Sequence, residues 1–218
     1  MTRRILLATL LPWLCMASAV AENAEPESCD VALMVLGIAQ DAGRPQLGNP
    51  DDPAWDDPSL KRFAASLGLV DTRGDEVRRW LFEATPDVRE QLQMLDRRFP
   101  TERYVGIDGI FVTHAHMGHY TGLMHFGFEA ARTDALPVYA MPEMRSYLET
   151  NGPWSQLVGY RNIELMALED GARVDLGNGL AVTPFAVPHR REFSETVGFR
   201  IDGPAKSAIF IPDINGWD

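Results

Sequence analysis

The feature that most restricts the fold of this chain is a group of three histidines that directly follows a short apolar run. The run at 110–112 predicts a buried strand, and His114, His116 and His119 come after its end. Residues two apart in an extended chain point to the same side, so His114 and His116 can share one ion. A helical turn from His116 then returns His119 to the same region. Imidazoles at the end of a buried strand are costly to leave unpaired, so the pattern indicates a metal centre, with a chance cluster as the alternative.

Two later apolar runs end in a similar way. His189 follows the run at 182–187, and Asp213 follows the run at 209–211, each after an intervening proline. Ligands at the ends of separate strands converge on one rim of a sheet. His189 would complete a three-histidine site with one position open for water, and Asp213 would bridge to a second ion or hold that water. The alternatives are a solvent-facing His189 and an Asp213 that only caps a turn.

The apolar runs alternate with helical patterns in the first half of the chain and follow one another in the second half. This order favours a mixed α/β sandwich over a doubly wound parallel sheet. A loop at 38–58, rich in Asp, Gly, Pro and Asn, precedes a short helix at 59–67 with Ser59 as its N-cap. We expect further helices at about 85–98 and 142–150, and strands at 31–36, 80–84, 109–113, 137–140, 163–168, 180–187, 196–201 and 207–211.

The N-terminus has the layout of a secretory signal peptide. Arg3 and Arg4 precede an uncharged apolar run at 5–20, and Ala19-Val20-Ala21 forms a small-x-small cleavage site. An uncleaved membrane anchor is the alternative, although the run is short for a span and contains Pro12. We therefore expect a signal peptide at 1–21, a flexible lead-in at 22–30, one domain at 31–218, and a periplasmic or secreted protein.

Charge and cysteine content exclude several classes of function. The net charge of −11, with no basic stripe, argues against a nucleic-acid partner. Of the two cysteines, Cys15 lies in the signal, so the remaining Cys29 can form neither an internal disulfide nor a cysteine-based metal site. We expect a small-molecule substrate and no stable membrane association after signal cleavage, while the oligomeric state is left open.

The residues described above resemble the metallo-β-lactamase superfamily. The resemblance is carried by the segment Thr113-His114-Ala115-His116-Met117-Gly118-His119, by Pro188-His189 and by Pro212-Asp213. Within the superfamily, the chain is similar to the branch that contains coenzyme PQQ synthesis protein B. That likeness rests on the segments at 35–37, 84–92, 182–188 and 195–198. The resemblance implies an αβ/βα sandwich with metal ions at one edge of the paired sheets.

The resemblance also implies roles for individual residues. His114, His116 and His189 would bind a first metal ion, His119 a second, and Asp213 would bridge both. Asp87 would support a ligand from behind. The metal would be zinc, as one or two ions, with iron or manganese as alternatives. A metal-bound hydroxide, oriented by the catalytic Asp213, would then hydrolyse an ester, amide, lactam or phosphoester.

Three departures from the family pattern leave alternatives open. Gly118 stands where the family has an aspartate, so the second site loses a carboxylate. The chain ends five residues after Asp213, before the family's last histidine and strands, so we expect a C-terminally incomplete sandwich. The cysteine-rich segment of the PQQ branch is missing, and that branch usually lacks a histidine at the position of His189. An iron-dependent oxidative enzyme and a non-catalytic metal-binding module therefore remain alternatives.

Two further residues near the expected site are assigned lesser roles. Asp41 lies in the loop segment at 37–43, which is glycine-spaced but does not match a dinucleotide fingerprint, and it is a candidate for substrate contact. His125 lies six residues beyond His119 and is expected to be a half-buried helix residue rather than a ligand.

Overall fold

The computed structural model describes residues 30–217 of the chain. The expected signal peptide at 1–21, Cys29 and nearly all of the lead-in lie outside these residues. Within them, no helix is both long enough and apolar enough to cross a membrane.

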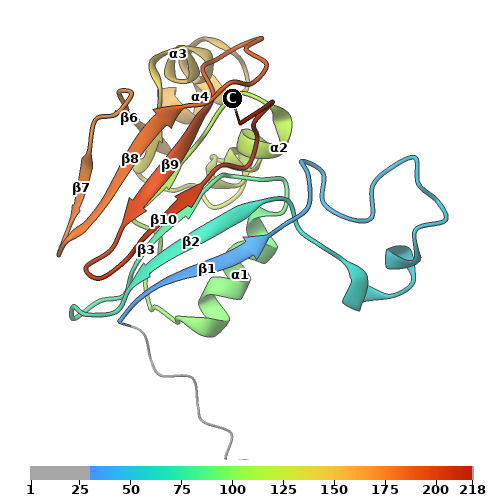
Figure 1. The fold of residues 1–218 in the computed structure, drawn as a ribbon, viewed down its shortest axis with the longest axis horizontal. Coiled ribbons are helices and arrows are strands. Elements are labelled where there is room, and N and C mark those ends of the chain that lie inside the picture. The colour runs from blue at the N-terminus through green and yellow to red at the C-terminus, as the bar shows by residue number, and fades with distance from the viewer. Residues whose placement is uncertain (1–29, 218) are drawn as a thin grey trace, which may run out of the picture.

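Two β-sheets pack face to face (Figure 1). The first has the order β1-β2-β3-β4-β5-β6, antiparallel from β1 to β3 and parallel from β3 to β6. The second is antiparallel, with the order β10-β9-β8-β7. The strands are β1 (Val31–Gly37), β2 (Ser66–Asp71), β3 (Arg78–Phe82), β4 (Gly109–Phe111), β5 (Leu136–Ala140), β6 (Ile163–Ala167), β7 (Val174–Gly177), β8 (Leu180–Ala186), β9 (Val197–Asp202) and β10 (Ser207–Phe210).

The helices cover the first sheet on the face opposite the second sheet. They are α1 (Val88–Arg98), α2 (Met117–Tyr120), α3 (Pro142–Thr150) and α4 (Trp154–Gly159), with the 3-10 turn η3 (Thr121–Phe126) after α2. Two further 3-10 turns, η1 (Pro53–Trp55) and η2 (Pro58–Leu60), lie in the long segment between β1 and β2. Buried side chains of α1, α3 and α4 join one apolar cluster with β3, β4 and β5. The order of layers is therefore helices, sheet, sheet. The outer helix layer that an αβ/βα sandwich would add over β7–β10 is not among residues 30–217.

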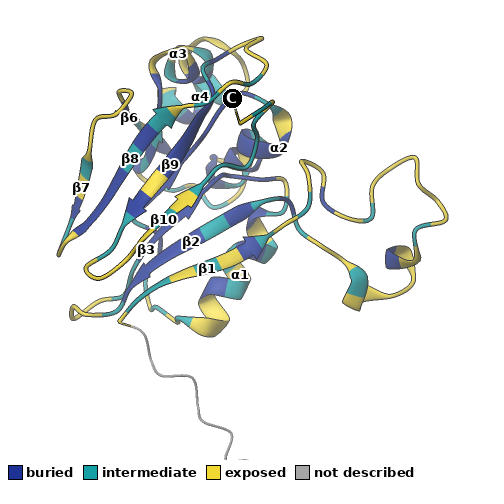
Figure 2. Ribbon diagram, in the orientation of Figure 1, coloured by how far each residue is buried: buried dark blue, intermediate teal, exposed yellow. Residues whose placement is uncertain are grey.

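A second apolar cluster fills the space between the sheets. Phe111 stacks on Phe82 at 5.1 Å and meets Phe199 of the opposite sheet edge-on at 5.6 Å between ring centroids. All three rings are fully buried, and Figure 2 shows that burial concentrates on the inner strands. On the other face, Leu95 of α1 sits directly over Gly68 of β2, where an added Cβ would lie 2.7 Å from its Cδ2 atom. The two clusters hold the first sheet between two dry layers.

Most expected elements are present, and the errors have local causes. The helix expected at 59–67 is wrong: the chain forms only η2 and then enters β2 at Ser66. The strand β2 was not predicted because Gly68 interrupts its apolar run. Its residues are nevertheless buried between α1 and the second sheet. The segments β7 and α4 were not expected either. The remaining strands and the helices α1 and α3 lie within a few residues of their expected positions.

Four strands deliver chemically active residues to one rim of the sandwich. In the first sheet, β1 and β4 both run parallel to β3, because two antiparallel pairings separate β1 from β3. In the second sheet, β8 and β10 run parallel to each other through β9. Asp41 follows β1, the three clustered histidines follow β4, His189 follows β8 and Asp213 follows β10. Because β1 and β4 run in the same direction, as do β8 and β10, the two strands of each pair end at the same edge of their sheet.

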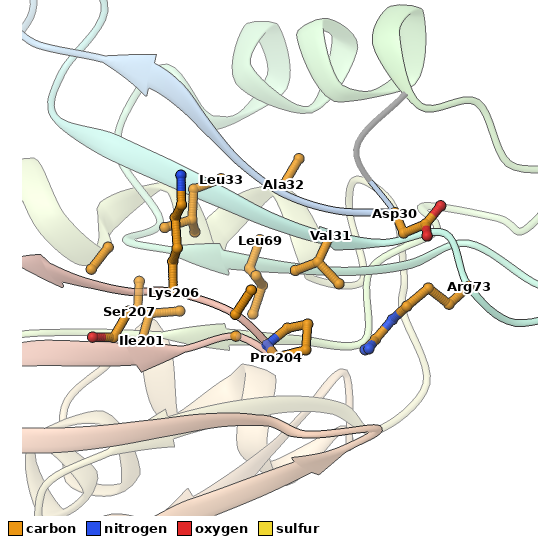
Figure 3. Close-up of a pocket in the computed structure, with 13 residues that line it drawn as sticks. Asp30, Val31, Ala32, Leu33, Leu69, Arg73, Ile201, Pro204, Lys206 and Ser207 are labelled. Carbon is orange, nitrogen blue, oxygen red and sulfur yellow. The ribbon is translucent and has the colours of Figure 1, made fainter. Parts of the chain in front are cut away.

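The opposite ends of β1 and β10 border a pocket of about 730 Å³. Figure 3 shows it between Val31 and Leu33 at the start of β1 and Pro204 and Lys206 in the turn between β9 and β10. Its walls are mainly apolar. Because it adjoins the starts of these strands, it is separate from the rim that carries the histidines.

Candidate metal centre

The first group at the rim consists of three imidazoles and one carboxylate. Ligand atoms of His114, His116, His189 and Asp213 all lie within 4.8 Å of one another. The Nδ1 atom of His116 is 2.8 Å from Nε2 of His114 and 3.2 Å from Nε2 of His189. Zinc–nitrogen bonds of about 2.0–2.1 Å in a tetrahedron separate neighbouring ligands by about 3.3 Å. The spacing of these atoms therefore suits a single ion between them.

The rings of His116 and His189 are oriented from behind. The outer nitrogen of His116, Nε2, is 2.8 Å from a carboxylate oxygen of Glu192, and the outer nitrogen of His189, Nδ1, is 2.9 Å from Oδ1 of Asn215. These oxygens only accept hydrogen bonds, so in the neutral rings the protons lie on the outer nitrogens. The inner nitrogens then present lone pairs to each other, and a cation between them would remove this repulsion.

Asp213 lies close to histidines of both groups. Its Oδ2 atom is 3.4 Å from Nε2 of His114, 3.5 Å from Nε2 of His189 and 3.2 Å from Nε2 of His119. His114 and His119 together hold the pKa of the Asp213 carboxyl far below its usual range. Burial lowers the pKa of His114, whose outer Nδ1 atom is 2.8 Å from the hydroxyl of Thr113. A carboxylate in this position can serve two ions at once.

The second group is His119, Asp213 and Asp41. Nε2 of His119 lies 3.4 Å from Oδ1 of Asp41 and 3.2 Å from Oδ2 of Asp213. The His119 side chain is only 4% exposed, and neither ring nitrogen has a hydrogen-bond partner. Asp41 was expected to be a substrate contact in a loop beside the site, and the structure places it at the same ion-sized gap as His119.

Glu83 lies behind His119 and was not foreseen from the sequence. It is fully buried, has a left-handed backbone (φ 80°), and places Oε1 3.6 Å from Nδ1 of His119. Burial opposes a charge on His119, but Glu83, Asp213 and Asp41 outweigh burial and raise the pKa of His119 to about 12. Without metal, a proton on His119 therefore balances three carboxylates, and a divalent cation would replace that proton. The signal in the sequence was a charged residue within the apolar run at 80–84.

Asp87 does not take the supporting role expected of it. Its Oδ2 atom accepts a hydrogen bond from the backbone N–H of Ala64 at 2.8 Å, and no contact with a ring of the two groups is recorded among the described residues. Ala64 in turn pairs with Ala39 in the loop after β1. The residue sits at the start of α1, so its carboxylate reaches the loop that carries Asp41 instead of a histidine.

The donor set fits a divalent metal ion. Imidazole nitrogens with carboxylate oxygens are the ligands preferred by zinc and by other late divalent metals. The buried atoms without partners at the rim, both nitrogens of His119 and Oε1 of Glu83, are polar groups that a purely structural cluster would be expected to satisfy. His125 lies outside both groups, half-buried in η3.

Comparison with known proteins identifies the class. The family model described as "Beta-lactamase superfamily domain" matches residues 78–218, which include all the rim histidines and Asp213. The chain therefore belongs to the metallo-β-lactamase superfamily.

A more particular likeness lies within that class. The chain is 26% identical over 208 residues to coenzyme PQQ synthesis protein B of Methylorubrum populi, covering 83% of this chain and 64% of that protein. The chain spans about 64% of the length of that relative.

Solved structures show the same fold. Zn²⁺-bound PqqB from Methylobacterium extorquens superposes with a TM-score of 0.67 at 23% identity, over 84% of this chain and 65% of that one. A diphosphatase of the PhnP family gives 0.56 at 23% identity over 78% and 61%. The short form of human tRNase Z gives 0.51 at 16% identity over 84% and 70%.

Proposed function

We propose that this protein is a metal-dependent hydrolase that cleaves an ester, amide, lactam or phosphoester bond of a small molecule. The observation that carries the proposal is the meeting of three imidazole nitrogens and a carboxylate oxygen from three separate segments at ion-sized spacing. The fold by itself serves many reactions, so the proposal rests on this donor set.

The metal would be held by His114, His116, His189 and Asp213, with zinc as the expected ion. When bound, such an ion lowers the pKa of a coordinated water to about 7 and polarises a carbonyl or phosphoryl oxygen. Glu192 and Asn215 keep the rings of His116 and His189 in the tautomer that points its lone pair inward. Asp213 faces the same space, where its carboxylate would orient the attacking water.

The first test joins metal analysis to hydrolysis. The purified full chain is assayed for metal content and for cleavage of p-nitrophenyl esters and bis(p-nitrophenyl) phosphate. We expect at least one equivalent of zinc, and hydrolysis that is lost on chelation and recovered on adding zinc back. His116→Ala should lower metal content and abolish hydrolysis, whereas His125→Ala, a histidine outside both groups, should leave both unchanged.

Other outcomes distinguish the alternatives. Bound iron together with oxygen consumption and no metal-dependent hydrolysis would favour an oxidative enzyme, to which His and carboxylate ligands are also suited. Purified protein that binds no transition metal would overturn the proposal, and stoichiometric metal without turnover on any substrate class would favour a binding module.

A further inference from the structure

Gly118 and Asp41 compete for one volume beside His119. An ideal Cβ atom built on Gly118 would collide with the Cα of Asp41, and it would lie 2.5 Å from Cβ and 2.8 Å from Cγ of that residue. Real Cβ atoms do not approach other atoms this closely. The absence of a side chain at position 118 is therefore what admits the Asp41 side chain to the rim, from a loop 77 residues earlier in the chain.

His119 supplies a second, independent indication of a ligand at this place. The residue is only 3% exposed, yet neither ring nitrogen makes a hydrogen bond. Its Nδ1 side faces the carboxylate of Glu83, so its Nε2 side faces Oδ1 of Asp41 and Oδ2 of Asp213. Two carboxylates and an unpartnered imidazole nitrogen converge within 4.8 Å.

We propose that Asp41 is a ligand of a second metal ion, held together with His119 and Asp213, and that it takes the place of a carboxylate at position 118. Three protein ligands with room for water is the ligand number of catalytic zinc sites. The inference rests on the proposed function, because Asp213 would be shared with the first ion.

The loop geometry is consistent with a fixed ligand. Asp41 lies within a turn closed by the hydrogen bond from the N–H of Gly43 to the carbonyl of Gln40 at 2.8 Å. The flanking residues are tied back to the domain, since the N–H of Ala65 donates to the carbonyl of Ala39 at 2.9 Å and the N–H of Arg44 to that of Arg62 at 2.7 Å. Asp41 is therefore anchored on both sides although its own side chain is half exposed.

The test counts metal ions in four proteins after dialysis against metal-free buffer, by elemental analysis and by the visible spectrum of the cobalt-substituted forms. We expect two equivalents in the wild type and one in Asp41→Ala. Gly118→Ala should also bind one, because its new methyl group displaces Asp41. Asp51→Ala, an exposed carboxylate in the same loop, should keep two.

Circular dichroism and the retained first equivalent report that each variant is folded.

The outcomes separate the two proposals. Two equivalents in Asp41→Ala or in Gly118→Ala, or one equivalent in the wild type, would overturn this inference while leaving the hydrolase proposal standing. A wild type without bound metal would overturn the proposed function itself.

Discussion

At the scale of single residues, His116 and His189 each use one ring nitrogen for the centre and the other for a hydrogen bond to the protein. His116 uses Nδ1 for the centre and gives Nε2 to Glu192, whereas His189 uses Nε2 for the centre and gives Nδ1 to Asn215. The choice of nitrogen follows from where the outer acceptor lies, since the proton stays with that acceptor. Affinity for the ion should therefore depend on residues that never touch it.

Replacing Glu192 tests this dependence. Glu192→Ala removes the acceptor that fixes the His116 ring, and such partners contribute about 10–100-fold to metal affinity. Because Glu192 is 43% exposed, we expect metal affinity to fall by about 10-fold, the lower end of that range. The affinity is measured by competition with a chromophoric chelator.

The matched control is Glu195→Ala on the same loop. Glu195 accepts hydrogen bonds from the backbone N–H of Glu143 at 3.0 and 3.1 Å and has no recorded contact with a rim histidine. The Glu195→Ala protein should bind the ion with the affinity of the wild type. Equal affinity in both variants would show that the Glu192 contact does not orient His116.

At the scale of elements, one buried arginine connects β3 to α1 and to the segment before β4. The Arg79 side chain is fully buried and pairs with Asp96 of α1 at 2.7 Å. It also donates to the carbonyl oxygens of Gly106 at 2.6 Å, Phe99 at 3.2 Å and Val105 at 3.2 Å. A planar guanidinium has enough donors for all four partners, which a lysine lacks.

Arg79→Leu should therefore destabilise the fold strongly. The change leaves three buried or partly buried backbone carbonyls without their donor, which costs about 1–3 kcal/mol for each buried group, whereas Asp96 is 48% exposed and its lost ion pair adds little. We expect the urea midpoint to fall accordingly in equilibrium unfolding followed by circular dichroism. Arg97→Leu, on the exposed side of α1, should change the free energy of unfolding by less than about 0.5 kcal/mol. A midpoint for Arg79→Leu equal to that of Arg97→Leu would refute the argument.

At the scale of the whole molecule, the candidate centre joins the two sheets. Its ligands follow β1 and β4 of the first sheet and β8 and β10 of the second, so a bound ion would stabilise their packing. Unfolding would separate the ligands and release the ion.

Metal removal should thus lower the thermal midpoint. An ion present at 1,000 times its dissociation constant stabilises a folded protein by about 4 kcal/mol. For a domain of this size that corresponds to a shift of about 8–16 °C, measured by differential scanning fluorimetry with and without chelator. The shift should persist in His125→Ala and shrink in His189→Ala. A midpoint unaffected by chelator in the wild type would contradict ion binding at the junction of the sheets.

Sequence patterns predicted the parts of the fold that local periodicity encodes. The helices α1 and α3 and the apolar strands were expected, as was the convergence of His114, His116, His119, His189 and Asp213. The strand β2 was missed because glycine interrupts its apolar run, and only the close approach of Leu95 explains why glycine is needed there.

Contacts between distant segments could not be predicted in this way. Asp87 was expected to support a metal ligand. Its carboxylate accepts a hydrogen bond from the N–H of Ala64 instead, and Ala64 pairs with Ala39 in the loop after β1. Glu83 was missed, and Asp41 was predicted only as a candidate substrate contact, because nothing near them in the sequence indicates that His119 lies beside both. Gly118 was read only as a lost carboxylate, and its steric role became visible when Asp41 was placed.

The excursion between β1 and β2 projects from the body of the protein and is mostly exposed (Figures 1 and 2). Two backbone hydrogen bonds join the ends of this excursion: the N–H of Arg44 donates to the carbonyl of Arg62 at 2.7 Å, and the N–H of Arg62 donates to the carbonyl of Arg44 at 3.1 Å. Among the described residues, no hydrogen bond or ion pair joins the segment 46–60 to Asp41. A peptide tag or a foreign loop could therefore be grafted at 46–60 for labelling or immobilisation, with the rim left in register.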